Sequence, residues 1–124
     1  MRFMMLVRVD ELQMKDNPPP PEMMSAMEAL IGEMQGTGAL LDTGGLTPDA
    51  ESVRLRLSKG RQSITDGPYT ESKEVVGGYA IVQATSRADA IALAKRFMAV
   101  HELWPGCEVE CEVRQIEEPA PETT

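Results

Sequence analysis

Residues 64–82 read ITDGPYTESKEVVGGYAIV, and the pattern of these residues indicates the kind of sheet to expect. It leaves a strand-like run, turns at Gly-Pro, crosses a charged segment and ends in an apolar run that starts with two glycines. Apolar residues fill both faces of that last run, which is typical of a strand buried on both sides. Residues 77–85 are therefore predicted to form an interior strand, and the charged loop before it is a candidate site.

The opening residues show the same property. In RFMMLVRV, residues 2–9, both faces of the expected strand are largely apolar. QMKDNPPPPE, residues 13–22, cannot continue a strand because consecutive prolines remove backbone donors and fix φ, so a stiff exposed connection is expected. Methionines, leucine and isoleucine then recur at helical spacing up to a stop at Gly36 or Gly38. This methionine stripe is interpreted as core filling, with an adaptable binding surface as the alternative.

The rest of the chain alternates strands with one more helix. The helix begins after Ser86, a candidate N-cap with Asp89 three residues on. The predicted elements are a strand at 2–9, a helix from 22, a strand at 39–46, a hairpin of 52–58 and 61–65, a strand at 77–85, a helix at 86–100 and a strand at 108–116.

This order predicts a ferredoxin-like βαββαβ α+β sandwich with an extra hairpin. Residues 1–117 are expected to form one domain, and residues 118–124 a disordered acidic tail. Two helices can cover only one face of the sheet. A second copy packed on the other face is the expected cover, which predicts a homodimer and a dimeric α+β barrel. The alternative is that this second face is only half exposed.

Charge and composition exclude several classes. Twelve basic residues face twenty acidic ones, so no nucleic-acid partner is expected. No run approaches the roughly 18 apolar residues of a membrane span, and the start lacks a signal peptide's ordered regions. Cys107 and Cys111 are too far apart along an expected strand to form a disulfide, which favours a reduced, cytoplasmic protein. A zinc site uses about four ligands, and only one histidine could join the two cysteines, so no metal site is expected.

The motif around the charged loop resembles a known family. Thr65-Asp66-Gly67-Pro68-Tyr69, followed by a TESKE stretch and Gly-Gly-Tyr, is similar to the signature of the YCII-related family, in particular its DGPF branch. Tyr69 stands where that branch has Phe. The resemblance covers nearly the whole chain and implies a dimeric α+β barrel. Members are mostly uncharacterised, some are proposed enzymes with a His-Asp pair in a cleft near the dimer interface, and DGPF members are often encoded beside sigma factors.

The resemblance transfers only part of that pair. The first-helix histidine has no counterpart, because no histidine precedes residue 101. Asp66 matches the motif aspartate, and His101 matches only a subgroup with a His-x-x-Trp-Pro stretch after the second helix. Asp66 is a candidate general base, or else a turn former whose carboxylate accepts backbone N–H bonds. His101 is a candidate acid or base, or else a helix cap.

Four more residues are candidate ligand contacts. Tyr69 and Tyr79 offer hydroxyls, Trp104 is a hydrophobic anchor or a pocket wall, and Arg54 could bind an anion or protect an edge strand. Three functions remain open: a small-molecule enzyme with a cofactor-free acid-base cleft, a ligand-binding or regulatory module, and a structural protein. A largely apolar cavity with satisfied polar groups would favour the ligand-binding module.

Overall fold

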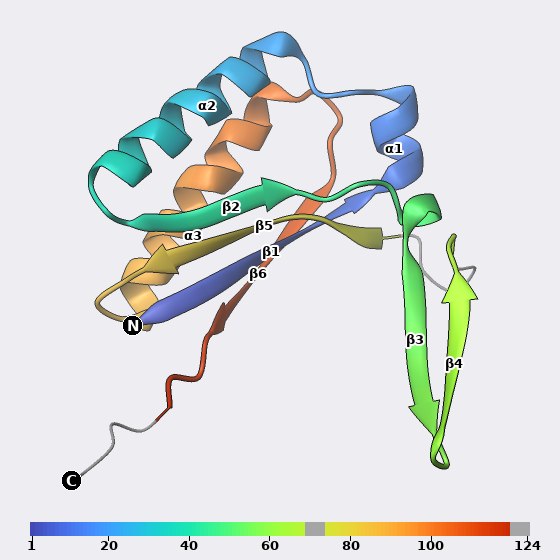
Figure 1. The fold of residues 1–124 in the computed structure, drawn as a ribbon. Coiled ribbons are helices and arrows are strands. Elements are labelled where there is room, and N and C mark those ends of the chain that lie inside the picture. Colours follow the sequence, from blue (N-terminus) through green and yellow to red (C-terminus); the bar gives the residue numbers. More distant parts are fainter. Residues whose placement is uncertain (69–73, 120–124) are drawn as a thin grey trace, which may run out of the picture.

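The computed structural model describes residues 1–68 and 74–119. Figure 1 shows the arrangement of the elements. In chain order they are β1 (Arg2–Asp10), α1 (Glu11–Asp16), α2 (Pro21–Gly36), β2 (Leu40–Gly45), the 3-10 turn η1 (Asp49–Glu51), β3 (Val53–Ser58), β4 (Arg61–Asp66), β5 (Glu74–Gln83), α3 (Arg87–Val100), the 3-10 turn η2 (His101–Leu103) and β6 (Val109–Gln115).

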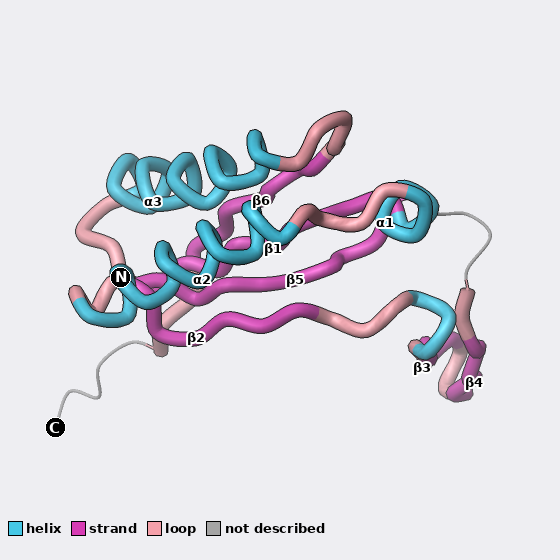
Figure 2. Tube along the Cα trace, turned by 90° about the horizontal axis from the view of Figure 1, so that it is seen from above, coloured by secondary structure: helices cyan, strands magenta, loops and turns pink. Residues whose placement is uncertain are grey.

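The main sheet has the strand order β2-β5-β1-β6, and its neighbouring strands are antiparallel. β1 and β5 occupy the two central positions, as their apolar faces predicted. With α2 and α3 on one side of the sheet, this is the ferredoxin-like α+β arrangement, and the predicted fold of the single chain is confirmed (Figure 2). The extra hairpin, β3 and β4, forms a separate two-stranded sheet.

Local sequence explains where the two long helices begin. α2 starts at Pro21, where the missing N–H and fixed φ of proline suit the first helical position. α3 starts after Ser86, whose hydroxyl accepts a hydrogen bond from the Asp89 N–H at 3.0 Å. The Asp89 carboxylate in turn accepts from the Thr85 N–H at 2.8 Å. The predicted cap is therefore confirmed.

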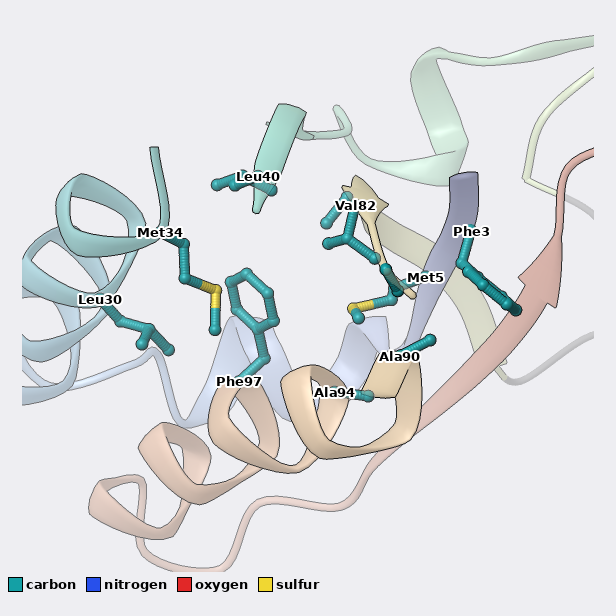
Figure 3. Packing of buried hydrophobic residues seen from close by; sticks show 11 residues of the cluster. Phe3, Met5, Leu30, Met34, Leu40, Val82, Ala90, Ala94 and Phe97 are labelled. Carbon is teal, nitrogen blue, oxygen red and sulfur yellow. The ribbon is translucent and has the colours of Figure 1, made fainter. Parts of the chain in front are cut away.

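The core lies between the sheet and the two helices (Figure 3). β1 and β5 direct alternate side chains into it, and Met34 and Phe97 meet them from α2 and α3. Its buried members are Phe3, Met5, Leu30, Met34, Leu40, Ala80, Val82, Ala84, Ala90, Ala94 and Phe97. Met5, Met34 and Val82 are at most 1% exposed. The core-filling interpretation of the methionine stripe thus holds for Met34.

None of the described helices lies over the opposite face of the sheet, which we call the open face (Figure 1). Met4 pairs with Ile81 and Leu6 pairs with Tyr79, and all four side chains alternate with core residues, so they point to the open face. They are half-buried. An apolar centre of this kind on an antiparallel sheet indicates a surface that another element covers.

The hairpin of residues 53–66, which we call the arm, leaves the end of the sheet. In Figure 1 it points away from the helix layer, and in Figure 2 its two strands are seen nearly end on. The two views together place the arm on the side of the open face. The Gly67 N–H donates to the Ser52 carbonyl at 2.9 Å and closes the base of the arm.

Three details differ from the sequence prediction. Residues 13–22 are not all connection, because α1 occupies Glu11–Asp16 before the prolines begin. The last strand begins at Val109, so Cys107 lies in the preceding loop and not on a strand with Cys111. β5 begins at Glu74, three residues before the expected start. Among the described residues, no helix is both long enough and apolar enough to cross a bilayer.

Candidate functional site

A cavity of about 350 Å³ lies between the sheet and the helices. β1, β2 and β5 form its floor, and α2, the end of α3 and η2 form its walls. Its lining is mostly apolar, and it includes His101 and Trp104. A volume of this order fits a small ligand. Among the described residues, every buried side-chain nitrogen or oxygen has a hydrogen-bond partner.

Glycines open the floor of this cavity. Gly45 pairs with Gly78, and both lie at positions that face the helices, where a longer side chain would fill the space. Gly77 is the extra residue of a bulge, since Val7 pairs with Gly78 while Arg8 pairs with Val76. A Cβ at Gly77 would lie 2.7 Å from Val9 Cγ2. Gly77 therefore marks a β-bulge, and a Cβ added at Gly78 would lie 3.2 Å from the Gly44 carbonyl oxygen.

Methionines supply much of the remaining lining. Six of the nine methionines border the cavity: Met5, Met14, Met23, Met24, Met27 and Met98. Their depth varies, because Met23 is 5% exposed and Met24 is 57% exposed. Unbranched, polarisable thioethers adapt to the shape of a bound group and make favourable contacts with aromatic rings. The part of the methionine stripe near the start of α2 thus has the features of an adaptable binding surface.

His101 stands at the end of α3, where it is the C-cap residue, and it is half-buried at the cavity wall. Its Nδ1 lies 2.9 Å from the Phe97 carbonyl oxygen. Because a carbonyl oxygen only accepts, Nδ1 is the protonated donor in this contact. Nε2 is then the ring nitrogen that can exchange a proton or hydrogen bond with a ligand. His101 thus caps the end of α3 through Nδ1, and Nε2 is not used by this contact.

Trp104 is 4% exposed and borders the same cavity. Its indole N–H donates to the Asn17 carbonyl at 2.9 Å, and the Asn17 side-chain amide donates to the Pro105 carbonyl at 2.9 Å. These two bonds tie the proline-rich connection to the loop after α3. Trp104 is therefore both the anchor and the pocket wall that the sequence left as alternatives.

The two thiols lie near this end of the molecule. Cys111 borders the cavity, and the Cys107 Sγ lies 3.3 Å from the His101 carbonyl oxygen, to which it donates. Both cysteines are free. Burial raises the pKa of each thiol, so both are protonated at neutral pH and are poor nucleophiles.

Tyr79 also borders the cavity, but its hydroxyl lies on the open face. It donates to the Asp42 carboxylate at 3.1 Å. The ring covers Gly44, where an added Cβ would lie 3.0 Å from the ring carbon Cε1. The hydrogen bond to Asp42, and then the repulsion between its charge and a phenolate, raise the pKa of Tyr79. Sequence reasoning missed Asp42, although a lone carboxylate in the apolar run ALLDTGGL was a signal.

The other candidate residues lie elsewhere. Asp66 is exposed at the end of β4 opposite Val53, and Arg54 is exposed on β3 opposite Thr65. Neither is among the described residues that line the cavity. The end of β4 and the end of α3 lie in separate parts of the molecule (Figure 1). One chain thus brings His101 and Trp104 to one cavity but not Asp66 or Arg54, while Tyr79 borders the cavity with its hydroxyl on the open face. Tyr69 lies outside the described residues.

Metal ligands do not gather in the described ranges 1–68 and 74–119, where no three His, Cys, Asp or Glu side chains come close enough to hold an ion. The arrangement at the cavity is suited to enclosing an apolar group and contacting one polar atom through His101.

Comparison with known proteins gives the family. The model of the YCII-related domain matches residues 1–116, which is nearly the whole chain. No curated protein gives a significant match. The match supports the family and not its DGPF branch, which stays a prediction. The chain belongs to the YCII-related family.

Proposed function

We propose that this YCII-related protein is a ligand-binding module that holds a small, largely apolar molecule in the methionine-lined cavity. The observation that carries the proposal is the cavity itself: about 350 Å³, bordered by six methionines and Trp104. Burial of apolar ligand surface would supply the binding free energy, at roughly 25 cal/mol per Å² before the cost of immobilising the ligand.

His101 supplies the polar contact in this proposal. Its Nε2 can accept a hydrogen bond from a ligand hydroxyl when the ring is neutral, or donate one to a carboxylate when the ring is charged. The preferred ligand is therefore an apolar body with one polar group. Thr43, another polar residue at the wall, already donates its hydroxyl to the Tyr79 carbonyl at 2.9 Å.

An apolar fluorescent probe, N-phenyl-1-naphthylamine, tests the proposal. The chain has one tryptophan, at the cavity wall, so energy transfer from Trp104 to the probe reports binding there. We expect saturable transfer that is lost in Val7→Phe, which fills the cavity. Val113→Phe is the matched control: it is also a half-buried valine facing the helices, and it lies outside the cavity lining. Equal transfer in both variants would contradict the proposal.

We further propose that the protein is a homodimer in which a second copy covers the open face. The apolar centre of that face is half-buried and is bordered by charge. Arg8 and Arg114 each lie 3.4 Å from a carboxylate oxygen of Glu112 at its β6 side. An apolar centre with a polar rim is the usual anatomy of a protein interface. Light scattering should give twice the 13.6 kDa chain mass, and a monomer at micromolar concentration would refute the dimer.

A cofactor-free acid-base enzyme is the second candidate, and the Tyr79–Asp42 pair favours it. A phenol held by a carboxylate can pass a proton to or from a substrate bound in a cleft between the open face and the second copy. Asp66 and His101, which lie on separate elements of one chain, would act together only if they came from two subunits. Loss of turnover in Asp42→Asn with unchanged probe binding would support this candidate. The free thiols fit a reducing compartment, so we propose the cytoplasm.

A further inference from the structure

The arm presents two chemically different faces. Strand alternation places the large apolar side chains on one face and the arginines on the other. The apolar face carries Val53, Leu55, Leu57 and Ile64, which are 51%, 64%, 71% and 68% exposed. Gln62 pairs with Leu57 and Asp66 pairs with Val53, so these two polar residues lie at the ends of the same face. The opposite face holds Arg54, Arg56 and Arg61 with small polar residues. Four large apolar side chains together on an exposed ribbon are characteristic of an interaction surface.

Stability gives a second reason to expect a partner for the arm. An isolated two-stranded hairpin is marginally stable in water and needs another surface to pack against. Every described residue of β3 and β4 is exposed in the single chain. The arm therefore lacks, within one chain, the packing that a persistent hairpin requires.

The direction of the arm favours a second copy of this chain as the partner. It stands beside the sheet on the side of the open face, away from the helices (Figures 1 and 2). A second copy seated on the open face would lie next to it. The arm carries four of the twelve basic residues and one of the twenty acidic ones, so it is basic while the rest of the chain, and hence a second copy, is acidic. This difference favours the encounter of two copies, whereas the contact itself is assigned to the apolar face.

We propose that the arm of each subunit clasps the second copy of this chain, with the apolar face of Val53, Leu55, Leu57 and Ile64 packed on the partner. This inference rests on the proposed dimer. It assigns to the inserted hairpin the role of extending the interface beyond the open face, and it accounts for apolar side chains that the single chain leaves in solvent.

Ile64→Glu and Thr65→Glu form a matched pair that tests the arm. The two residues are adjacent on β4, β-branched, exposed, and on opposite faces of the hairpin. Analytical ultracentrifugation should show the dimer dissociation constant raised about tenfold or more by Ile64→Glu, which places a charge in the packed face. Thr65→Glu should change it less than threefold. Leu55→Glu, at the residue that pairs with Ile64, should reproduce the Ile64→Glu effect.

The possible outcomes distinguish failure of the proposed arm contact from failure of the proposed dimer. A wild-type monomer would overturn both, whereas a wild-type dimer that Ile64→Glu and Thr65→Glu affect equally would overturn only the arm contact. Hydrogen exchange of the unmodified protein gives an independent measure that does not depend on how the variants fold. Amides of residues 53–66 should be protected in the dimer and should lose protection on dilution to the monomer. Protection that does not change with dilution would contradict the clasp.

Discussion

Replacing Gly77 by Ala should destabilise the protein through one defined contact. The added Cβ would lie 2.7 Å from Val9 Cγ2, whereas carbon atoms pack at about 3.5–4.0 Å, so one of the two must move by about 1 Å. Val9 cannot easily do so, because it is 6% exposed and β-branched. Overpacking of this kind costs about 1–3 kcal/mol. For a domain of this size that lowers Tm by about 3–6 °C per kcal/mol.

Urea unfolding of the wild type and four variants provides the assay. Gly32→Ala is the control, since an added Cβ there meets nothing within 4 Å and the helical position should gain about 0.5–1 kcal/mol. Val9→Ala alone should cost roughly 1.5–2 kcal/mol from lost burial. The double variant Gly77→Ala with Val9→Ala should lose at least about 1 kcal/mol less unfolding free energy than the two single variants lose together, because Val9→Ala removes the methyl group that clashes. If the two free-energy changes add within about 0.5 kcal/mol, Gly77→Ala does not act through a clash with Val9.

Three further predictions concern the cap, the anchor and the tyrosine. Ser86→Ala removes the bond to the Asp89 N–H and should cost about 1 kcal/mol in urea unfolding, and no loss would contradict the cap. Trp104→Phe keeps the ring but leaves the Asn17 carbonyl without its donor, which should cost about 1–3 kcal/mol, an effect absent if water replaces the indole. Asp42→Asn should lower the pKa of Tyr79 in an absorbance titration, run with Tyr69→Phe to leave one phenol. Folding raises the pKa of Tyr79, so the hydrogen bond to Asp42 stabilises the folded protein below the unfolded pKa of about 10, and this stabilisation is lost as the pH rises through the folded pKa. A Tyr79 pKa that Asp42→Asn leaves unchanged would exclude the Asp42 contact.

Much of the fold could be predicted from local sequence. Strands with apolar residues on both faces marked β1 and β5 as central, and Ser86 with Asp89 marked the start of α3. These signals work because burial and capping depend on residues close in the chain. The six-residue helix α1 was missed because fewer than two helical turns hold too few residues to show a helical apolar pattern, and the prolines after it favoured an irregular connection.

The site depended on contacts that sequence spacing does not show. The cavity exists because Gly45 and Gly78, far apart in the chain, are paired on adjacent strands. The Tyr79–Asp42 bond likewise requires the register of β2 against β5, which a bulge shifts by one residue. The alternation of Leu55 and Leu57 with arginines predicted a hairpin, but nothing local indicated that it leaves the sheet.

The most direct test of ligand binding in the cavity is an NMR titration of the methionine methyl groups. With methyl-labelled methionine, N-phenyl-1-naphthylamine should shift the resonances of the six methionines that border the cavity. Met4 lies on the open face and Met34 is buried in the core at 1% exposure, so both are internal controls whose methyl resonances should not shift. Shifts confined to Met4, or shared equally by all nine methionines, would contradict a ligand site between the sheet and the helices.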